Sequence, residues 1–254
     1  MEYKQEVQKY GKKDAVIALC AFVVAVALSM VDWILTTTFE SHATIFQFVG
    51  RVLIIGMTVA IVLVKKQGLA SIGCHKNKLI PALRFSLLLI IVFSAFGVIP
   101  GLIYGWEFNR LGTLIPILFT TIFMAAGEDI FFVGYLQTRL HGLFKNSALA
   151  IFVGAICFAL IHVPIGLLSP FPYGWVTSWV IWIIGHTFMV LIFRRHFSII
   201  PVIIAHTLAN FFTGGSLWRE FNFDYNADWA STAIILVFVI LLVLEIVKAV
   251  RKKA

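Results

Sequence analysis

Two adjacent carboxylates interrupt an otherwise apolar stretch of this sequence. Glu128 and Asp129 lie in AAGEDIFFVGYLQTRLHG, residues 125–142. A charged side chain at the centre of a bilayer costs about 2.5–3.5 kcal/mol on insertion scales, so such residues usually mark a functional site. We therefore expect chemistry here. An acidic pair solvated by a water-filled transport pathway is the alternative interpretation.

Three further polar side chains occur on later apolar stretches. FALIHVP places Phe158 four residues before His162, and AHTLANFF places Asn210 four residues after His206. Residues four apart share one face of a helix, so an imidazole and a carboxamide lie side by side on the second stretch. Both can donate hydrogen bonds to a developing negative charge. Polar side chains that only join neighbouring helices are the structural alternative.

A carboxylate, two imidazoles and an amide suit a hydrolase. The carboxylate would act as a base for water, an imidazole would orient that water, and the other donors would stabilise a tetrahedral oxyanion. Glu128, His162 and His206 would equally suit a catalytic metal site with an open position. The sequence has no HExxH motif, so it does not decide between the two. A transporter and a bis-histidine haem protein are the remaining classes.

Membrane-spanning helices must position these residues. The chain has 254 residues, is 61% hydrophobic and only 13% charged, which is about half the charged fraction of a soluble domain. We predict an all-α polytopic membrane protein, with about eight transmembrane helices in one bundle and a single domain over 1–254. Runs long enough to span fall at approximately 15–37, 44–64, 82–104, 112–137, 147–163, 175–193, 198–213 and 229–248.

The loop charges predict the orientation. Most of the 20 Lys and Arg residues, Arg139 among them, fall in alternate loops and near the two ends of the sequence. By the positive-inside rule both termini are cytoplasmic, in a multi-pass protein of the cell membrane. We therefore attribute the net charge of +8 to membrane topology. We expect membrane lipids as partners and no nucleic acid. The three cysteines are scattered, which argues against a disulfide framework or a zinc ribbon.

Other ionisable residues within the spans are given structural roles. Asp32 and Arg51 lie on the first two spans at similar distances from the short loop between them. We expect them to form a structural ion pair, because an opposite charge is what a buried charge in a membrane requires. His186, in WIIGHTFMVLIF, is interpreted as a packing residue.

The order of the motifs resembles a known family. An acidic pair on one span, FxxxH on the next and HxxxN two spans later is similar to the CPBP family. These are the CAAX proteases and bacteriocin-processing (Abi) enzymes, including the type II CAAX prenyl endopeptidases. The resemblance covers about 112–213. The family motif EExxxR reads EDIFFV over residues 128–133, so Asp129 replaces the second acid and Val133 replaces the arginine.

The resemblance implies a role for each matching residue. Glu128 would activate water, and His162 would help hold it. His206 and Asn210 would stabilise the oxyanion. Asp129 and Phe158 would be supporting residues.

The implied activity is that of an intramembrane endopeptidase acting on a membrane-associated or lipidated peptide or protein. We favour a glutamate-dependent mechanism that requires no cofactor. A divalent metal such as zinc, held by Glu128, His162 and His206, is the alternative. The second functional hypothesis is a catalytically weak or silent relative, serving as a membrane binding, regulatory or bacteriocin-immunity protein. Val133, in the arginine position, favours that hypothesis.

Overall fold

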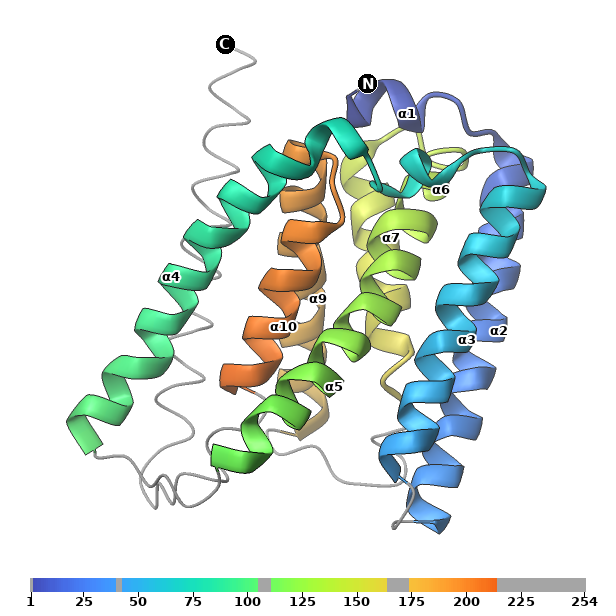
Figure 1. Cartoon of the computed structure of the whole chain (residues 1–254). Helices are drawn as coiled ribbons and strands as arrows, with labels where there is room; N and C mark the ends of the chain where they lie inside the picture. Colours follow the sequence, from blue (N-terminus) through green and yellow to red (C-terminus); the bar gives the residue numbers. More distant parts are fainter. Residues whose placement is uncertain (1, 40–42, 105–110, 164–173, 214–254) are drawn as a thin grey trace.

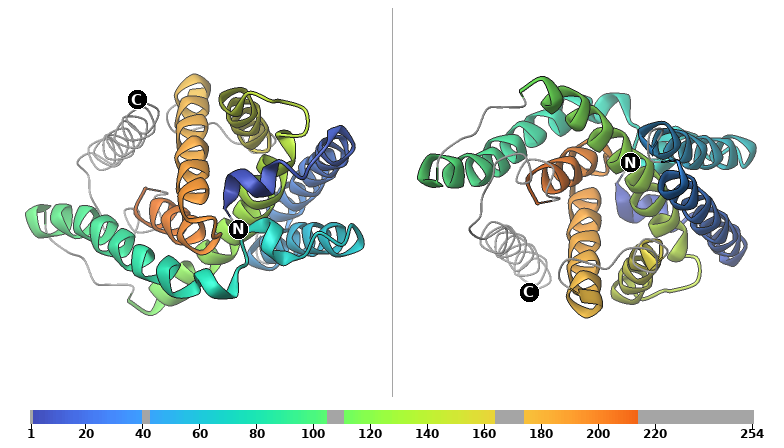
Figure 2. Two further views of the ribbon diagram at one scale, coloured as in Figure 1. Left: turned by 90° about the horizontal axis from the view of Figure 1, so that it is seen from above. Right: turned by 90° about the horizontal axis from the view of Figure 1, so that it is seen from below.

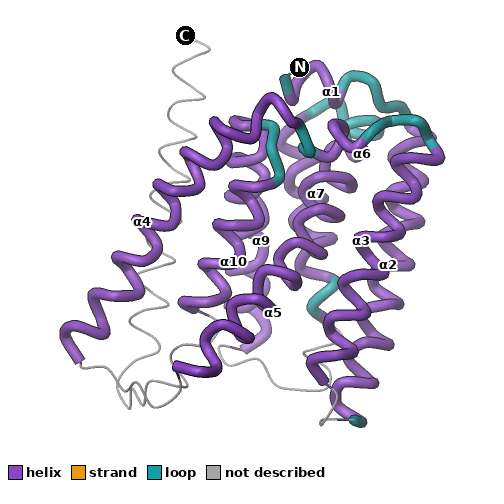
Figure 3. The backbone as a smooth tube through the Cα atoms, viewed as in Figure 1, coloured by secondary structure: helices purple, strands orange, loops and turns teal. Residues whose placement is uncertain are grey.

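The computed structural model of the chain describes residues 2–39, 43–104, 111–163 and 174–213. Within these ranges all regular secondary structure is helical (Figure 3). The predicted class, an all-α polytopic membrane protein, is confirmed. The elements in chain order are α1 (Tyr3–Val7), α2 (Lys12–Thr38), α3 (Ala43–Val64), η2 (Leu69–Ile72), η3 (Lys76–Lys78), α4 (Leu79–Tyr104), α5 (Leu111–Asp129), η4 (Ile130–Leu136), α6 (Gln137–Leu140), α7 (Ser147–Leu160), α9 (Gly174–His196) and α10 (Ile200–Thr213).

The predicted spans coincide with helices wherever the structure describes the chain. The first seven correspond to α2, α3, α4, the continuous run α5–η4–α6, α7, α9 and α10. The eighth, 229–248, lies outside the described residues. Within the described ranges, four stretches are long and apolar enough to cross a membrane: Lys12–Thr38, Ile45–Val64, Leu118–Leu140 and Ser178–His196. Ser147–Leu160 and Ile200–Asn210 are shorter apolar helices.

The outward faces of these helices are apolar. Val23, Val64 and Ile80 are each more than half exposed. Contiguous exposed apolar surface marks a contact with protein or lipid, and hydrocarbon is as apolar as these side chains. Together with the long apolar helices, the exposed faces indicate insertion into a membrane.

The helix that carries the two acids lies inside the bundle. α5 packs against α3 on one side and α10 on the other, and α10 also packs against α4 and α9. α2 packs on α3, and α7 packs on α9 (Figures 1 and 2). A side chain from α5 can therefore meet partners from two helices that are distant in the sequence.

A π-helix follows the acidic pair directly. α5 ends at Asp129, η4 is a π-helix over Ile130–Leu136, and α6 resumes the α-helical form at Gln137. Thr138 donates from its Oγ1 to the carbonyl oxygens of Gly134 and Tyr135, both at 2.8 Å. π-helical turns are rare and occur frequently at functional sites. Hydrophobicity alone does not predict the π-helix, because the extra residue that a π-turn accommodates leaves the span as apolar as before.

The sequence places Arg139 among the basic residues of a loop, but the structure buries its side chain. It lies in α6 and is fully buried, with its guanidinium over the rings of Tyr10 and Tyr135 at 4.3 and 4.5 Å. It donates to Gln67 Oε1 at 2.7 Å and to Ser71 Oγ at 2.8 Å. Arg139 therefore joins the N-terminal segment to the η2 loop at the end of the bundle where α1 lies (Figure 1).

Candidate active site

Glu128 is held between two helices. Its side chain is almost fully buried, and Oε1 lies 3.0 Å from Nη2 of Arg51 on α3. Its other oxygen, Oε2, lies 3.8 Å from Nε2 of His206 on α10. The two carboxylate oxygens therefore have different neighbours, one a cation and the other an imidazole.

Asp129 contacts the same imidazole from its other edge. Its side chain is 1% exposed, and Oδ1 lies 3.1 Å from Nδ1 of His206. When Nδ1 carries the proton it donates to this carboxylate, which fixes the orientation of the ring. His206 thus lies between both acids. The sequence had placed this ring beside Asn210 as an oxyanion donor and had assigned no contact to Asp129.

Phe158 brings the histidines together. Its ring lies 5.0 Å from the ring of His162, 5.1 Å from that of His186 and 6.0 Å from that of His206, centroid to centroid. The predicted packing role of His186 agrees with its burial and its stacking on Phe158. The aromatic ring is therefore an apolar contact that the three imidazoles share.

His162 follows the end of a short helix. Asn146 caps α7 by accepting from the backbone N–H groups of Ala148 and Leu149, and the helix has 14 residues. At about 1.5 Å per residue it spans roughly 21 Å, short of the roughly 30 Å hydrocarbon core. His162 is therefore not carried to the far boundary of the membrane.

The ring of His162 is held on two sides. Nδ1 bonds to the carbonyl oxygen of Phe158 at 2.8 Å. The ring stacks on Trp182 of α9, with centroids 4.4 Å apart. His162 also lies within electrostatic reach of Glu128. Asn210 lies one turn beyond His206 on α10 and is partly exposed.

The partner of Arg51 differs from the predicted one. The ion pairs among the described residues include Arg51–Glu128 but not Arg51–Asp32. Asp32 lies instead against Gly50, where an added Cβ would be 3.0 Å from its carboxyl carbon. Asp32 remains within electrostatic reach of Arg51, so both acids are near this arginine, which makes its ion pair with Glu128.

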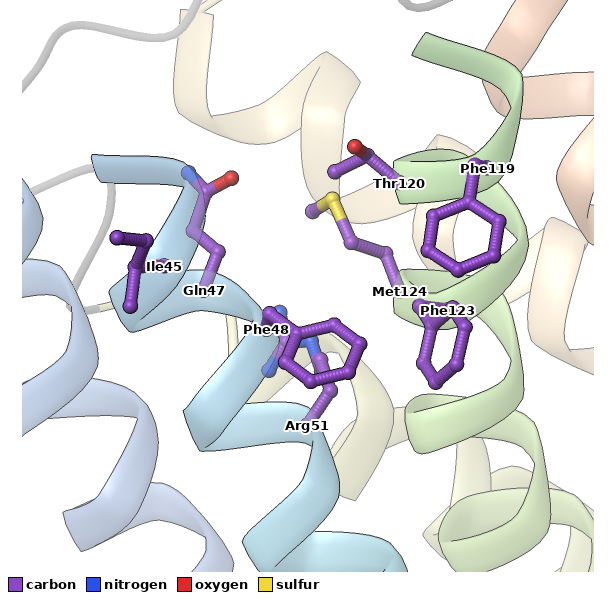
Figure 4. A pocket seen from close by; sticks show the side chains of 8 residues that line it. All are labelled: Ile45, Gln47, Phe48, Arg51, Phe119, Thr120, Phe123 and Met124. Atoms are coloured by element: carbon purple, nitrogen blue, oxygen red, sulfur yellow. The ribbon is translucent and has the colours of Figure 1, made fainter. Parts of the chain in front are cut away.

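A cavity of about 220 Å³ opens between α3 and α5 (Figure 4). Its lining is largely apolar, with Phe48, Phe119, Phe123 and Met124 prominent and Arg51 beside them. Apolar pockets of this kind bind apolar groups, with few polar atoms to fix their orientation. The cavity lies directly beside the ion pair of Glu128.

The metal-ligand set that the sequence left open is not assembled. In the part of the chain that the structure describes, no group of three or more His, Cys, Asp or Glu side chains is arranged to hold a metal ion. The nitrogens of His206 face the two carboxylates, and Nδ1 of His162 bonds to backbone.

Comparison with known protein families gives a match to part of the chain. Residues 110–212 match the family described as Rce1-like, Type II CAAX prenyl endopeptidase. The matched segment nearly equals the 112–213 range inferred from the motifs, and it includes Glu128, Asp129, His162 and His206. Arg51 lies outside it. No curated protein matches the sequence.

Proposed function

We propose that the protein hydrolyses a peptide bond within the membrane, because residues 110–212 match the Rce1-like, Type II CAAX prenyl endopeptidase family model. The carrying observation is the 3.8 Å separation of Glu128 Oε2 and His206 Nε2. Two polar atoms at that separation can both contact one water at about 2.8 Å. Glu128, His162, His206 and Asn210 would do the chemistry.

The proposed reaction needs only these side chains. Water bound by Glu128 attacks the carbonyl carbon and transfers a proton to Oε2. His162 helps to hold the water. Negative charge develops on the carbonyl oxygen and is stabilised by N–H donors from Asn210 and from Nε2 of His206, whose ring carries a proton on both nitrogens between the two acids. The C–N bond then breaks, and the departing amine takes the proton from Glu128, which restores the carboxylate.

The cavity between α3 and α5 supports an apolar substrate. Aromatic side chains line it beside Arg51, whose guanidinium bonds Glu128. An apolar side chain or a lipid group of the substrate would occupy it while the scissile carbonyl approaches Glu128. Membrane-associated peptides and lipidated proteins have this character.

We further propose that both termini are cytoplasmic and that the protein resides in the cell membrane, since basic residues gather on that side.

A digest of candidate peptides by the purified protein tests this function. The panel would contain prenylated C-terminal peptides, bacteriocin precursors and small membrane proteins, each incubated with and without a chelator and analysed by mass spectrometry. We expect internal cleavage of at least one substrate, unaffected by chelator. Cleavage abolished by the chelator and restored by zinc would overturn the metal-free mechanism.

A silent relative that binds a membrane partner is the second candidate. The observation that favours it is Val133, which stands where the family motif has arginine. A chain that binds one member of the panel and cleaves none would support this function instead.

A further inference from the structure

We propose that Arg51 is a positioning residue of the active site, supplied by a helix outside the segment that matches the family. The proposal rests on the proposed function of Glu128. α3 ends at Val64, well before residue 110, where the matched segment begins. Nevertheless Nη2 of Arg51 lies 3.0 Å from Glu128 Oε1, and both side chains are only 8% exposed.

The backbone of α5 makes room for this contact. Gly127 precedes Glu128, and a Cβ built on it would lie 2.9 Å from Cδ and 3.0 Å from Cβ of Arg51. Real Cβ contacts are not that short, so only glycine lets the aliphatic part of Arg51 cross α5 at this level. The guanidinium then reaches the residue that follows in the sequence.

Aromatic side chains lie beside Arg51 on its cavity side as well. Phe48 and Phe123 line the neighbouring cavity together with Arg51 (Figure 4), and their rings lie close to each other and to Phe119 through a chain of aromatic contacts. The aliphatic part of Arg51 therefore packs between α5 and these aromatic side chains, with its guanidinium on Glu128. A fixed guanidinium is a fixed anchor for a carboxylate.

The anchor determines which oxygen of Glu128 is available. Glu has several rotatable bonds, so an unanchored carboxylate would sample many orientations. With Oε1 held by Arg51, Oε2 remains 3.8 Å from His206 Nε2. Buried ion pairs contribute little net stability compared with apolar replacements. We infer that this pair serves to orient the general base rather than to stabilise the fold.

Four variants separate positioning from folding. Gly127→Ala displaces Arg51 without changing any charge, and Gly56→Ala on α3 is its matched control, because nothing lies within 4 Å of a Cβ there. Arg51→Leu removes the anchor, and Arg51→Lys keeps a cation. For a peptide that the wild type cleaves, kcat and KM would be measured beside the melting temperature.

We expect Arg51→Leu and Gly127→Ala to lower kcat by about 10- to 100-fold with little change in KM, since a misplacement of about 1 Å can cost that much. Arg51→Lys should recover part of the loss, and Gly56→Ala should match the wild type. Two results would overturn the proposal. One is a wild-type kcat in Arg51→Leu. The other is an equal loss of kcat in Arg51→Leu and Arg51→Lys that follows their loss of melting temperature.

The contact can also be tested without any substrate. Thermal unfolding of Arg51→Leu, Glu128→Gln and the double variant forms a double-mutant cycle. We expect the double variant to be no less stable than Arg51→Leu, because that single change leaves a carboxylate buried without its partner. Additive losses would refute the contact. Coupled losses in a protein that cleaves nothing would contradict the proposed hydrolysis but leave the contact standing.

Discussion

Asp129→Asn isolates the contact between the second acid and His206. The substitution keeps the size of a side chain that is 1% exposed, and it removes one negative charge 3.1 Å from Nδ1 of His206. The motif alone predicts a mild effect, because Val133 leaves Asp129 without an i+4 ion pair. The contact with His206 on α10 predicts a strong effect, because the charge of Asp129 has a partner there that the motif does not include.

The size of the effect follows from the hydrogen bond that changes. If the Asn oxygen still accepts from Nδ1, a bond to a charged group worth about 1.5–3 kcal/mol becomes a neutral one worth about 0.5–1.5 kcal/mol. The difference of about 1–1.5 kcal/mol corresponds to about a tenfold loss in rate. If the Asn amide turns its NH₂ towards Nδ1, the tautomer of His206 reverses. The equivalent change in a serine protease costs about 10⁴-fold, which sets the upper limit.

The assay compares kcat of Asp129→Asn and the wild type on one cleaved peptide, together with their melting temperatures. We expect a loss between about tenfold and 10⁴-fold with the helical signal and the cooperative unfolding retained. Asp129→Glu is the matched control, since it keeps the charge but lengthens the side chain. Full activity in Asp129→Asn would refute the view that the acid orients His206.

Three further predictions concern folding and topology. Val133→Arg should lower the melting temperature and the yield in detergent, because Val133 is fully buried in an apolar cluster with Phe193 and Val202; the motif alone predicts that this change is tolerated, and unchanged stability would support the motif. Arg139→Met should destabilise the protein by about 3 kcal/mol in denaturant unfolding, because charge-assisted hydrogen bonds and two cation–π contacts are lost; a loss below about 1 kcal/mol would show that the buried network is not structural. A cysteine placed at Lys76 or Arg195 should react with impermeant maleimide only from the cytoplasmic side, and external labelling would overturn the orientation.

Much of the scaffold could be predicted because a bilayer restricts it so strongly. Backbone groups in hydrocarbon must bond within the segment, so a long apolar run can only be a helix. The expected range 44–64 and the observed α3, Ala43–Val64, agree within a residue at each end. The N-terminal helix α1 and the π-helix η4 were not predicted. The first is short and polar, and the second changes hydrogen bonding without changing hydrophobicity.

The candidate site was predictable in its residue types but not in its pairings. The sequence predicts Glu128, His162 and His206 as site residues. In the structure the rings of both histidines contact Phe158, and Glu128 lies beside His206. The contact of His206 with Asp129 joins residues 77 apart in sequence, which no i+4 rule reaches. Arg51 was assigned to Asp32 because both have similar depth. Depth does not specify the direction of a side chain around its helix, and Gly127 is the feature that would have indicated α5.

The most direct test of the account is the rate of peptide hydrolysis by Glu128→Gln. Glutamine keeps the volume of the side chain and can still bond Arg51 through its amide oxygen, but it cannot accept a proton from water. We predict that hydrolysis falls to the background level while the helical signal and the cooperative unfolding are retained, with some loss of stability because Arg51 keeps its charge. Full peptidase activity in Glu128→Gln would contradict the assignment of Glu128 as the base.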